Sequence, residues 1–267
     1  MANTIQNAAN QLSAKKGAPK LADYVKSMEK EIAKALPSVI TPERFTRITL
    51  SALSSNPTLQ QCTPQSFLGA MMTAAQLGVE PNTPLGQAYL LPYKNKGVLE
   101  CQFQLGYKGL IDLAYRSGEI SVIQAHTVYE NDEFSYEFGL DPKLNHKPAV
   151  KDRGEPIAFY AMFKTKDGGY GFEVMSVEDV RKHAKKYSKS YGSEYSPWNT
   201  SFVEMAKKTV LKQVLKYAPL KSDFAKQVTA DETIKSEIAP DMLDVMPDPI
   251  EAEGTVVDPV TGEINPQ

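Results

Sequence analysis

The spacing of apolar residues changes twice along this chain, and this change limits the possible folds more than any other feature. Three segments between residues 21 and 78 carry apolar side chains at helical spacing. Residues 81–105 alternate with period two, a glycine turn and a short helix follow, and four further runs up to residue 175 are typical of strands. Helical spacing then returns between residues 176 and 220. Because helices and strands are segregated, the sequence predicts an α+β fold: a mixed or antiparallel sheet with an inserted helix, flanked by N-terminal and C-terminal helices.

Local signals mark the ends of several elements. Thr41 and Thr63 are each followed by a proline, which is typical of a helix start. Pro92 predicts that its strand lies at the edge of a sheet, because proline cannot donate to a strand ladder. Ser201 and Glu204 have the spacing of a capping box and predict the start of the last helix.

The two ends of the chain differ in composition from its body. Residues 1–20 are rich in Asn, Gln, Ala and Ser, which predicts a mobile arm. Residues 229–267 are acidic, contain prolines and lack periodicity, which predicts a disordered tail. The sequence therefore predicts one folded domain over residues 21–228.

Several classes of protein are disfavoured by what the sequence lacks. No apolar run approaches the roughly 18 residues that span a bilayer, and the N-terminus lacks the order of a signal peptide, so we expect a cytoplasmic protein. Cys62 and Cys101 are far apart and have no histidine nearby, which argues against a disulfide framework or a zinc site. The chain contains neither a GxxxxGK[ST] loop nor a GxGxxG motif within a βαβ unit, so we expect no ATP-driven chemistry.

A metal-dependent nuclease is one alternative, because four acidic residues fall within one short window. They are Glu130, Asp132, Glu133 and Glu137. The window connects two predicted strands and has no partner acid at nuclease spacing, so a solvated loop explains it more simply.

Positive charge is concentrated near the C-terminal helices. Residues 181–226 contain eleven basic and three acidic residues, a net charge of +8, whereas residues 231–267 carry a net charge of −9. On a helix over residues 202–217, Lys208, Lys212 and Lys216 are spaced by four and fall opposite the apolar face. This row is either a solvated face or a row of phosphate contacts.

Aromatic residues are interleaved with the basic ones at three places, as in proteins that bind single strands. Trp198 follows a basic, tyrosine-rich stretch, and it either stacks on bases or packs the entry to the next helix. A hairpin tip carries Tyr93, Lys94 and Lys96, and the segment "GYKGLIDLAYR" carries Tyr107, Lys108 and Arg116. Its GYKG stretch is either a tight strand-to-helix turn or a loop that clamps a nucleic-acid backbone, as the GxxG loop does in KH-type RNA-binding modules.

Two blocks of this sequence resemble the signature blocks of the RecT family of phage and prophage recombination proteins. They are "QLGYKGLIDLAYRSG" at residues 104–118 and "PWNTSFVEMAKKTVLKQVLKYAP" at residues 197–219. The segment "QLGVEPNTPLGQAYLLPY" at residues 76–93 also fits the family pattern. The resemblance covers roughly residues 40–220.

The resemblance implies a DNA single-strand annealing protein of homologous recombination and repair that is not an enzyme and uses no ATP. Such a protein binds single-stranded DNA in a basic groove of a ring or filament, and pairs it with a complementary strand. Its expected partners are itself, a 5′ to 3′ exonuclease and a host single-strand binding protein, with no cofactor beyond a modulating role for magnesium. We expect a bacterial host cell as its location and no membrane.

The matched motifs also give the residues that we expect to contact DNA. They are Tyr93, Lys94, Lys96, Gln104, Tyr107, Lys108, Arg116, Trp198, Asn199, Lys207, Lys208, Lys212 and Lys216. Because an acidic tail can compete with DNA for a basic groove, we also expect that deleting residues 231–267 preserves the fold and strengthens DNA binding.

Overall fold

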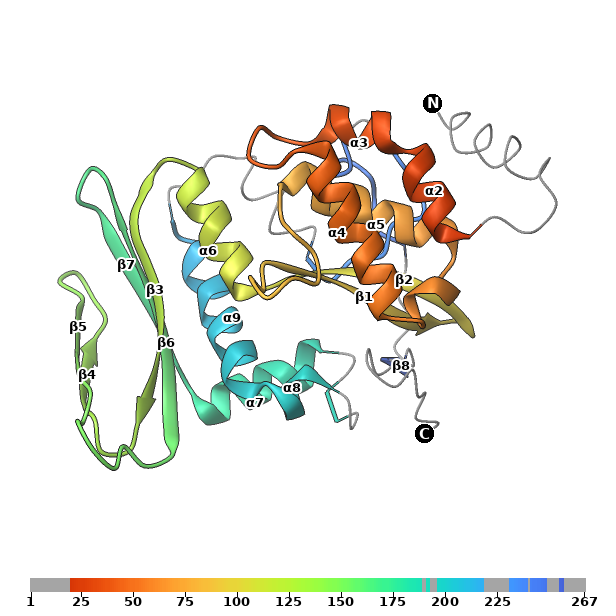
Figure 1. The fold of residues 1–267 in the computed structure, drawn as a ribbon. Coiled ribbons are helices and arrows are strands. Elements are labelled where there is room, and N and C mark those ends of the chain that lie inside the picture. Colours follow the sequence, from red (N-terminus) through yellow and green to blue (C-terminus); the bar gives the residue numbers. More distant parts are fainter. Residues whose placement is uncertain are drawn as a thin grey trace. The chain divides into compact units, whose positions relative to one another are not determined.

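The computed structural model describes residues 20–188, 191–192, 196–218, 231–239, 241–248 and 255–256 (Figure 1). They fall into two compact units, divided between Gly109 and Leu110, and the C-terminal residues from 231 onward belong to the first unit. Helices and antiparallel strands are both present, which confirms the predicted α+β class. Within these described ranges, no helix combines the length and the hydropathy needed to cross a membrane.

The first unit packs helices against a β-hairpin (Figure 1). Its helices and strands are α2 (Leu21–Ser27), α3 (Glu29–Ala35), α4 (Pro42–Ser55), the 3₁₀ turn η1 (Leu59–Gln61), α5 (Pro64–Leu77), β1 (Ala88–Asn95) and β2 (Val98–Leu105). The caps at Thr41 and Thr63 are confirmed, because their hydroxyls accept hydrogen bonds from the N–H groups of Arg44 and Ser66. Helix α5 is the core of the unit and is buried along almost its whole length.

The β1–β2 hairpin has one buried face and one partly open face. Leu90 pairs with Phe103 and both side chains are buried, whereas Tyr89, next along β1, pairs with Gln104 on the opposite face. The predicted edge position of Pro92 is corrected by the sheet order β2–β1–β8, in which β1 is central. Strand β8 is described over Thr255–Val256, and these two residues pair with Lys94 and Tyr93, which follow Pro92.

Part of the acidic segment after residue 229 is packed, which its sequence does not predict. Its described residues 231–239 and 241–248, called here the C-terminal strap, pack against the first unit, and Ile234 and Met242 are fully buried. Thr233 and Phe103 exchange backbone hydrogen bonds at 2.9 and 3.2 Å, and the Asp231 carboxylate accepts one from the N–H of Leu105 at 2.7 Å. The sequence-based expectation that residues 231–267 can be deleted without loss of the fold takes no account of these contacts, which such a deletion would remove.

The strap also lies directly against helix α5. A Cβ atom added to Gly69 would stand 1.9 Å from the carbonyl oxygen of Lys235, so only glycine permits this approach. The backbone N–H of Met242 donates to the Gln76 side chain at 2.6 Å, and the buried Lys235 ammonium donates to the carbonyl of Met242. Burial lowers the pKa of Lys235, while the nearby carboxylates of the strap oppose that shift.

The second unit is a layered structure in which a sheet lies between a hairpin and helices (Figure 1). The sheet has the antiparallel order β3–β6–β7, and the hairpin β4–β5 lies on the side opposite α9. The elements are β3 (Ile120–Tyr129), β4 (Glu133–Glu137), β5 (Lys143–Lys147), β6 (Pro156–Thr165), β7 (Tyr170–Ser176), α7 (Val177–Tyr187), α8 (Pro197–Thr200) and α9 (Phe202–Leu215). Helix α6 (Tyr107–Arg116) begins in the first unit and ends in the second.

Two features of this unit differ from the sequence-based expectation. Strand β5 has no counterpart in the predicted pattern and pairs with β4 in full register. The predicted cap at Ser201 is absent, because that hydroxyl makes no capping hydrogen bond and the short helix α8, capped by Ser196, precedes α9.

Candidate nucleic-acid interface

The two glycines of the GYKG turn are explained by a close approach of backbone. The N–H of Gly106 donates to the carbonyl of Gln87 at 2.8 Å. A Cβ atom at Gly106 would stand 2.2 Å from the carbonyl oxygen of Gly86, and one at Gly109 would stand 2.1 Å from that of Gln87. Larger residues at either glycine would therefore push the 86–87 backbone away.

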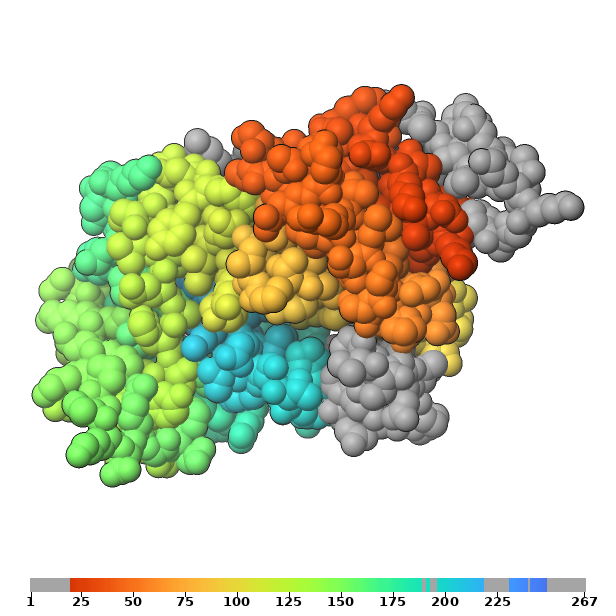
Figure 2. Space-filling view, viewed as in Figure 1, coloured from red at the N-terminus to blue at the C-terminus, as the bar shows by residue number. Residues whose placement is uncertain are grey.

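The 80–87 loop that meets this turn is itself held by side-chain hydrogen bonds near its start. Arg44 on α4 forms two hydrogen bonds with the Glu80 carboxylate, at 2.6 and 3.1 Å. The Asn82 side chain accepts from the N–H of Leu90 at 2.8 Å, which joins the loop to β1. Figure 2 shows the amber segment around residues 80–90 at the surface beside the orange atoms of the α4–α5 region. The loop is thus a fixed support for the turn rather than a free connection.

The strand that precedes the turn argues against the KH-type alternative. In KH domains the GxxG loop clamps nucleic-acid backbone, and it joins two helices. Here β2 precedes the turn and α6 follows it, so the turn has the strand-to-helix form.

Lys108 projects from this turn and is exposed. Among the residues that the structure describes, none forms an ion pair with its ammonium group, whereas Arg116 at the end of the same helix pairs with Asp112 at 2.8 Å. Tyr107 beside it is half-buried. The first turn of a helix also leaves backbone N–H groups without intrahelical partners, which favours an anion there.

The hairpin tip gives a mixed result. Lys96 is exposed in the left-handed region at φ +50° and Lys94 is half-buried, so both remain accessible in part. Tyr93 is only 3% exposed, and burial raises the pKa of its hydroxyl. The Tyr93 ring is therefore not available for stacking on a base in this structure. Gln104, on the open face of β2, is half-buried.

The block at residues 197–219 is mainly core in the part that the structure describes, up to residue 218. Trp198 is 6% exposed, with ring centroids 6.1 Å from Phe202 and 6.4 Å from Tyr191. Trp198 thus packs at the entry to α9, as the alternative interpretation has it, and little of its ring is exposed to a base in this structure.

The lysine row on α9 is not one continuous surface. Lys208 is 3% exposed, Lys212 is half-buried and Lys216 is exposed. The Lys216 ammonium donates to the Gln213 side chain at 2.7 Å. Helix α9 packs on β6, β7 and β3, so part of the face expected to be solvated is enclosed. Of the three predicted phosphate contacts, only Lys216 is exposed in this structure.

Two other residues of this block keep some exposure. Asn199 on α8 is exposed and Lys207 on α9 is half-buried. Burial lowers the pKa of His126 on β3, and electrostatic interactions with His146 and Lys207 lower it further. Lys207 therefore acts electrostatically on the sheet of its own unit.

The acidic window at residues 130–137 is structural at its centre. The Asp132 carboxylate is fully buried and accepts from Arg153 Nε at 2.9 Å, from the N–H groups of Tyr129 and Ala149, each at 2.9 Å, and lies 3.0 Å from His146 Nε2. The Arg153 hydrogen bond is the main reason why the pKa of Asp132 lies well below its usual range. These partners occupy the lone pairs that a metal ion would need.

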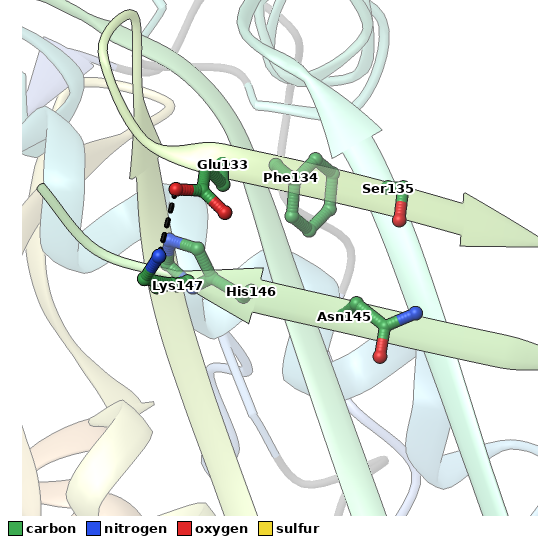
Figure 3. A pocket seen from close by; sticks show the side chains of 6 residues that line it. All are labelled: Glu133, Phe134, Ser135, Asn145, His146 and Lys147. Carbon is green, nitrogen blue, oxygen red and sulfur yellow. Dashed lines mark hydrogen bonds and ion pairs between the residues drawn. The ribbon is translucent and has the colours of Figure 1, made fainter.

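The neighbouring carboxylates do not converge on Asp132. Glu133 points to Lys147, with 2.8 Å between Nζ and Oε1, at the rim of a hollow of about 420 Å³ on the β4–β5 hairpin (Figure 3). Throughout the described part of the chain, no group of three or more His, Cys, Asp or Glu side chains is placed to hold a metal ion. The geometry thus gives the nuclease alternative no support.

One residue with binding chemistry is missing from the sequence-based set. Tyr89 is 38% exposed on the open face of β1. The sequence contained a signal for this residue. Tyr89, Leu91 and Tyr93 are three largely apolar residues on the face of the strand opposite the core-facing Ala88 and Leu90. An apolar row on the outer face of a hairpin calls for an explanation.

Comparison with known proteins agrees with the resemblance found in the sequence. The RecT family profile matches residues 43–244, a range that includes much of the C-terminal strap. The chain is 42% identical to "Protein RecT" of Escherichia coli (strain K12) over 213 residues, 77% of each chain. It is also 33% identical over 202 residues to "Uncharacterized protein YqaK" of Bacillus subtilis (strain 168), which is 73% of this chain and 66% of that relative. The chain therefore belongs to the RecT family.

Proposed function

We propose that this protein binds single-stranded DNA and anneals it to a complementary strand without ATP. Membership of the RecT family supports this proposal, since a relative with 42% identity bears the RecT name. The single observation that carries it in this chain is Lys108, an exposed cation with no ion pair among the described residues, on a turn held rigid by close-packed backbone. A fixed ammonium beside free helix N–H groups suits a phosphate.

Annealing needs no chemical energy source. Base pairing and stacking release on the order of 1.4 kcal/mol per base-pair step, so the protein has only to offset phosphate repulsion and keep bases accessible. Lys108, Lys96 and Lys94 would neutralise phosphates of the first strand. The second strand would then be selected by pairing with the first, so we expect little dependence on base sequence.

We further propose that the active form is an oligomer, in a ring or a filament, in which adjacent subunits present one continuous groove. Such an assembly would hold many nucleotides of one strand at once, which single subunits cannot do. A 5′ to 3′ exonuclease that exposes the strand, and a host single-strand binding protein, are the partners this activity would require.

An annealing assay tests the proposal directly. Two complementary oligonucleotides labelled as a fluorescence donor and acceptor are mixed with and without the full-length protein, in the absence of ATP. We expect faster pairing with the protein and a steep loss of the effect as salt rises. No acceleration at any salt concentration would refute the proposal, and a clear preference for RNA strands would favour the RNA-binding alternative.

Lys108 is then tested by salt dependence. Lys108→Ala should reduce the slope of log affinity against log salt concentration by about one, because one phosphate contact is lost. The matched control is Lys147→Ala, since Lys147 is an exposed lysine paired with Glu133 on the β4–β5 hairpin. An unchanged slope for Lys108→Ala, or an equal change for both variants, would remove Lys108 from the site.

A further inference from the structure

Tyr89 lies at the open end of the outer hairpin face. The residue is 38% exposed, while Tyr93, two residues further along the same face, is only 3% exposed. Across the ladder Tyr89 is opposite Gln104. The outer face is therefore accessible at the end nearest the GYKG turn and closed towards Tyr93.

Gly86 brings Tyr89 and Lys108 together. A Cβ atom built at Gly86 would stand 3.2 Å from the Tyr89 hydroxyl oxygen and 3.6 Å from Cδ of Lys108. Gly86 also has φ +64°, a conformation that side-chain-bearing residues rarely adopt. A bare backbone at this point lets an aromatic ring and a lysine side chain lie next to each other.

The Tyr89 side chain is not needed to satisfy a buried group. Its hydroxyl makes no hydrogen bond with any residue in the described part of the chain. By contrast, Tyr115 accepts from the N–H of Ile123 and Tyr170 donates to the carbonyl of Pro142, each at 3.3 Å. Those two tyrosines serve local structure, whereas the Tyr89 hydroxyl has no partner among the described residues and the residue is partly exposed.

We propose that Tyr89 stacks on a base of the bound single strand, with Gln104 and Lys108 contacting the same nucleotide or its neighbour. An aromatic face binds any base, an amide can bond to a base edge or sugar, and an ammonium pairs with a phosphate. Tyr89 and Lys108 meet at Gly86, and Gln104 lies opposite Tyr89 in the β1–β2 ladder. This inference rests on the proposed function and adds a base contact to a site otherwise defined by phosphate contacts.

A pair of oligonucleotides separates base contacts from phosphate contacts. One is labelled oligo-dT, and the other has the same length and phosphates but abasic sugars. Binding to the full-length protein is measured by fluorescence anisotropy for wild type, Tyr89→Ala, Tyr89→Phe, Lys108→Ala and Tyr170→Ala. Tyr170→Ala is the control, because it removes an exposed tyrosine from another part of the molecule.

We expect Tyr89→Ala to lose at least about fivefold in affinity for oligo-dT, to bind the abasic strand as wild type does, and to keep its salt slope. Tyr89→Phe should retain most of the oligo-dT affinity, and Lys108→Ala should weaken both strands. Equal weakening of both strands by Tyr89→Ala, or no weakening of either, would overturn the stacking role.

The outcome also distinguishes this inference from the proposed function. Wild-type protein that binds neither oligonucleotide would refute the proposed function itself, whereas tight binding with no difference between the two strands would refute only the base contact. Crosslinking of 5-iodouracil-substituted oligo-dT, followed by peptide mapping, gives a second measurement that needs no variant. Recovery of the crosslink at Tyr89 supports the inference, and recovery only elsewhere counts against it.

Discussion

The two blocks that carry the family resemblance use similar residues in different surroundings. In the block at residues 104–118, glycines pack against the 86–87 backbone and leave Lys108 exposed. In the block at residues 197–219, Trp198 and Lys208 are buried. Basic and aromatic residues therefore do not identify a binding surface by themselves, because a helix packed on a sheet encloses the same residue types that a turn exposes.

The largest expected effect is on the buried aromatic of the second block. Trp198→Ala should lower the free energy of unfolding by about 3–5 kcal/mol, since it leaves a large cavity beside Phe202. Denaturant unfolding of the full-length protein measures this, and Lys108→Ala should change stability by less than about 0.5 kcal/mol. Unchanged stability of Trp198→Ala together with weaker DNA binding would break the contrast between the blocks.

An intermediate effect is expected at the glycine turn of the first block. Gly109→Ala should destabilise by about 1–3 kcal/mol, because the new methyl group would collide with the Gln87 carbonyl 2.1 Å away. At an unhindered helix position the same change would instead stabilise by up to about 1 kcal/mol. The sign of the change in unfolding free energy thus decides whether the glycine is required by the close approach, and a stabilised variant would show that it is not.

The smallest effect concerns the charge of Lys207. Lys207→Ala should raise the pKa of His126, because a positive charge that disfavours the imidazolium is removed. The folded protein holds the pKa of His126 below its usual value, so stability falls as the pH drops through about 6.5. That loss should be smaller in the variant.

NMR titration of the His126 ring measures this shift. Lys212→Ala is the control, because Lys212 is not among the groups that shift the pKa of His126. A lowered pKa in Lys207→Ala, or an equal rise in both variants, would show that Lys207 does not act on this ring.

The spacing of apolar residues was sufficient to predict many of the helices and strands, because it shows which face of each element is buried. The alternation in β1 and β2 and the Thr–Pro helix starts depend on near neighbours in sequence, and these predictions agree with the structure. The prediction from Pro92 that its strand lies at an edge was wrong, because β1 also pairs with β8, whose residues lie far along the chain. The C-terminal strap has no periodicity, since Ile234 and Met242 are buried by irregular backbone rather than by a helix or strand.

The candidate site was predictable only in part, for a similar reason. Lys108 was identified because its turn has a recognisable local pattern. Lys208 lies on the face opposite the apolar stripe and is nevertheless 3% exposed, which helical spacing alone does not reveal. Tyr89 was missed because its proposed role depends on its proximity to Lys108. Lys108 follows Tyr89 in the sequence only after the rest of the β1–β2 hairpin, so a local pattern does not show that the two are close.

The C-terminal strap has a consequence for how the protein is made. The Asp231 carboxylate completes a hydrogen bond to Leu105, 126 residues earlier in the chain. At a translation rate of about 5–20 residues per second, the ribosome needs roughly 6–25 s to synthesise the residues between these two partners. During that interval the residues of the second unit are synthesised, while β2 and α5 still lack the strap residues that pack on them. We therefore expect the N-terminal part of the chain to reach its final structure only after the strap has been synthesised.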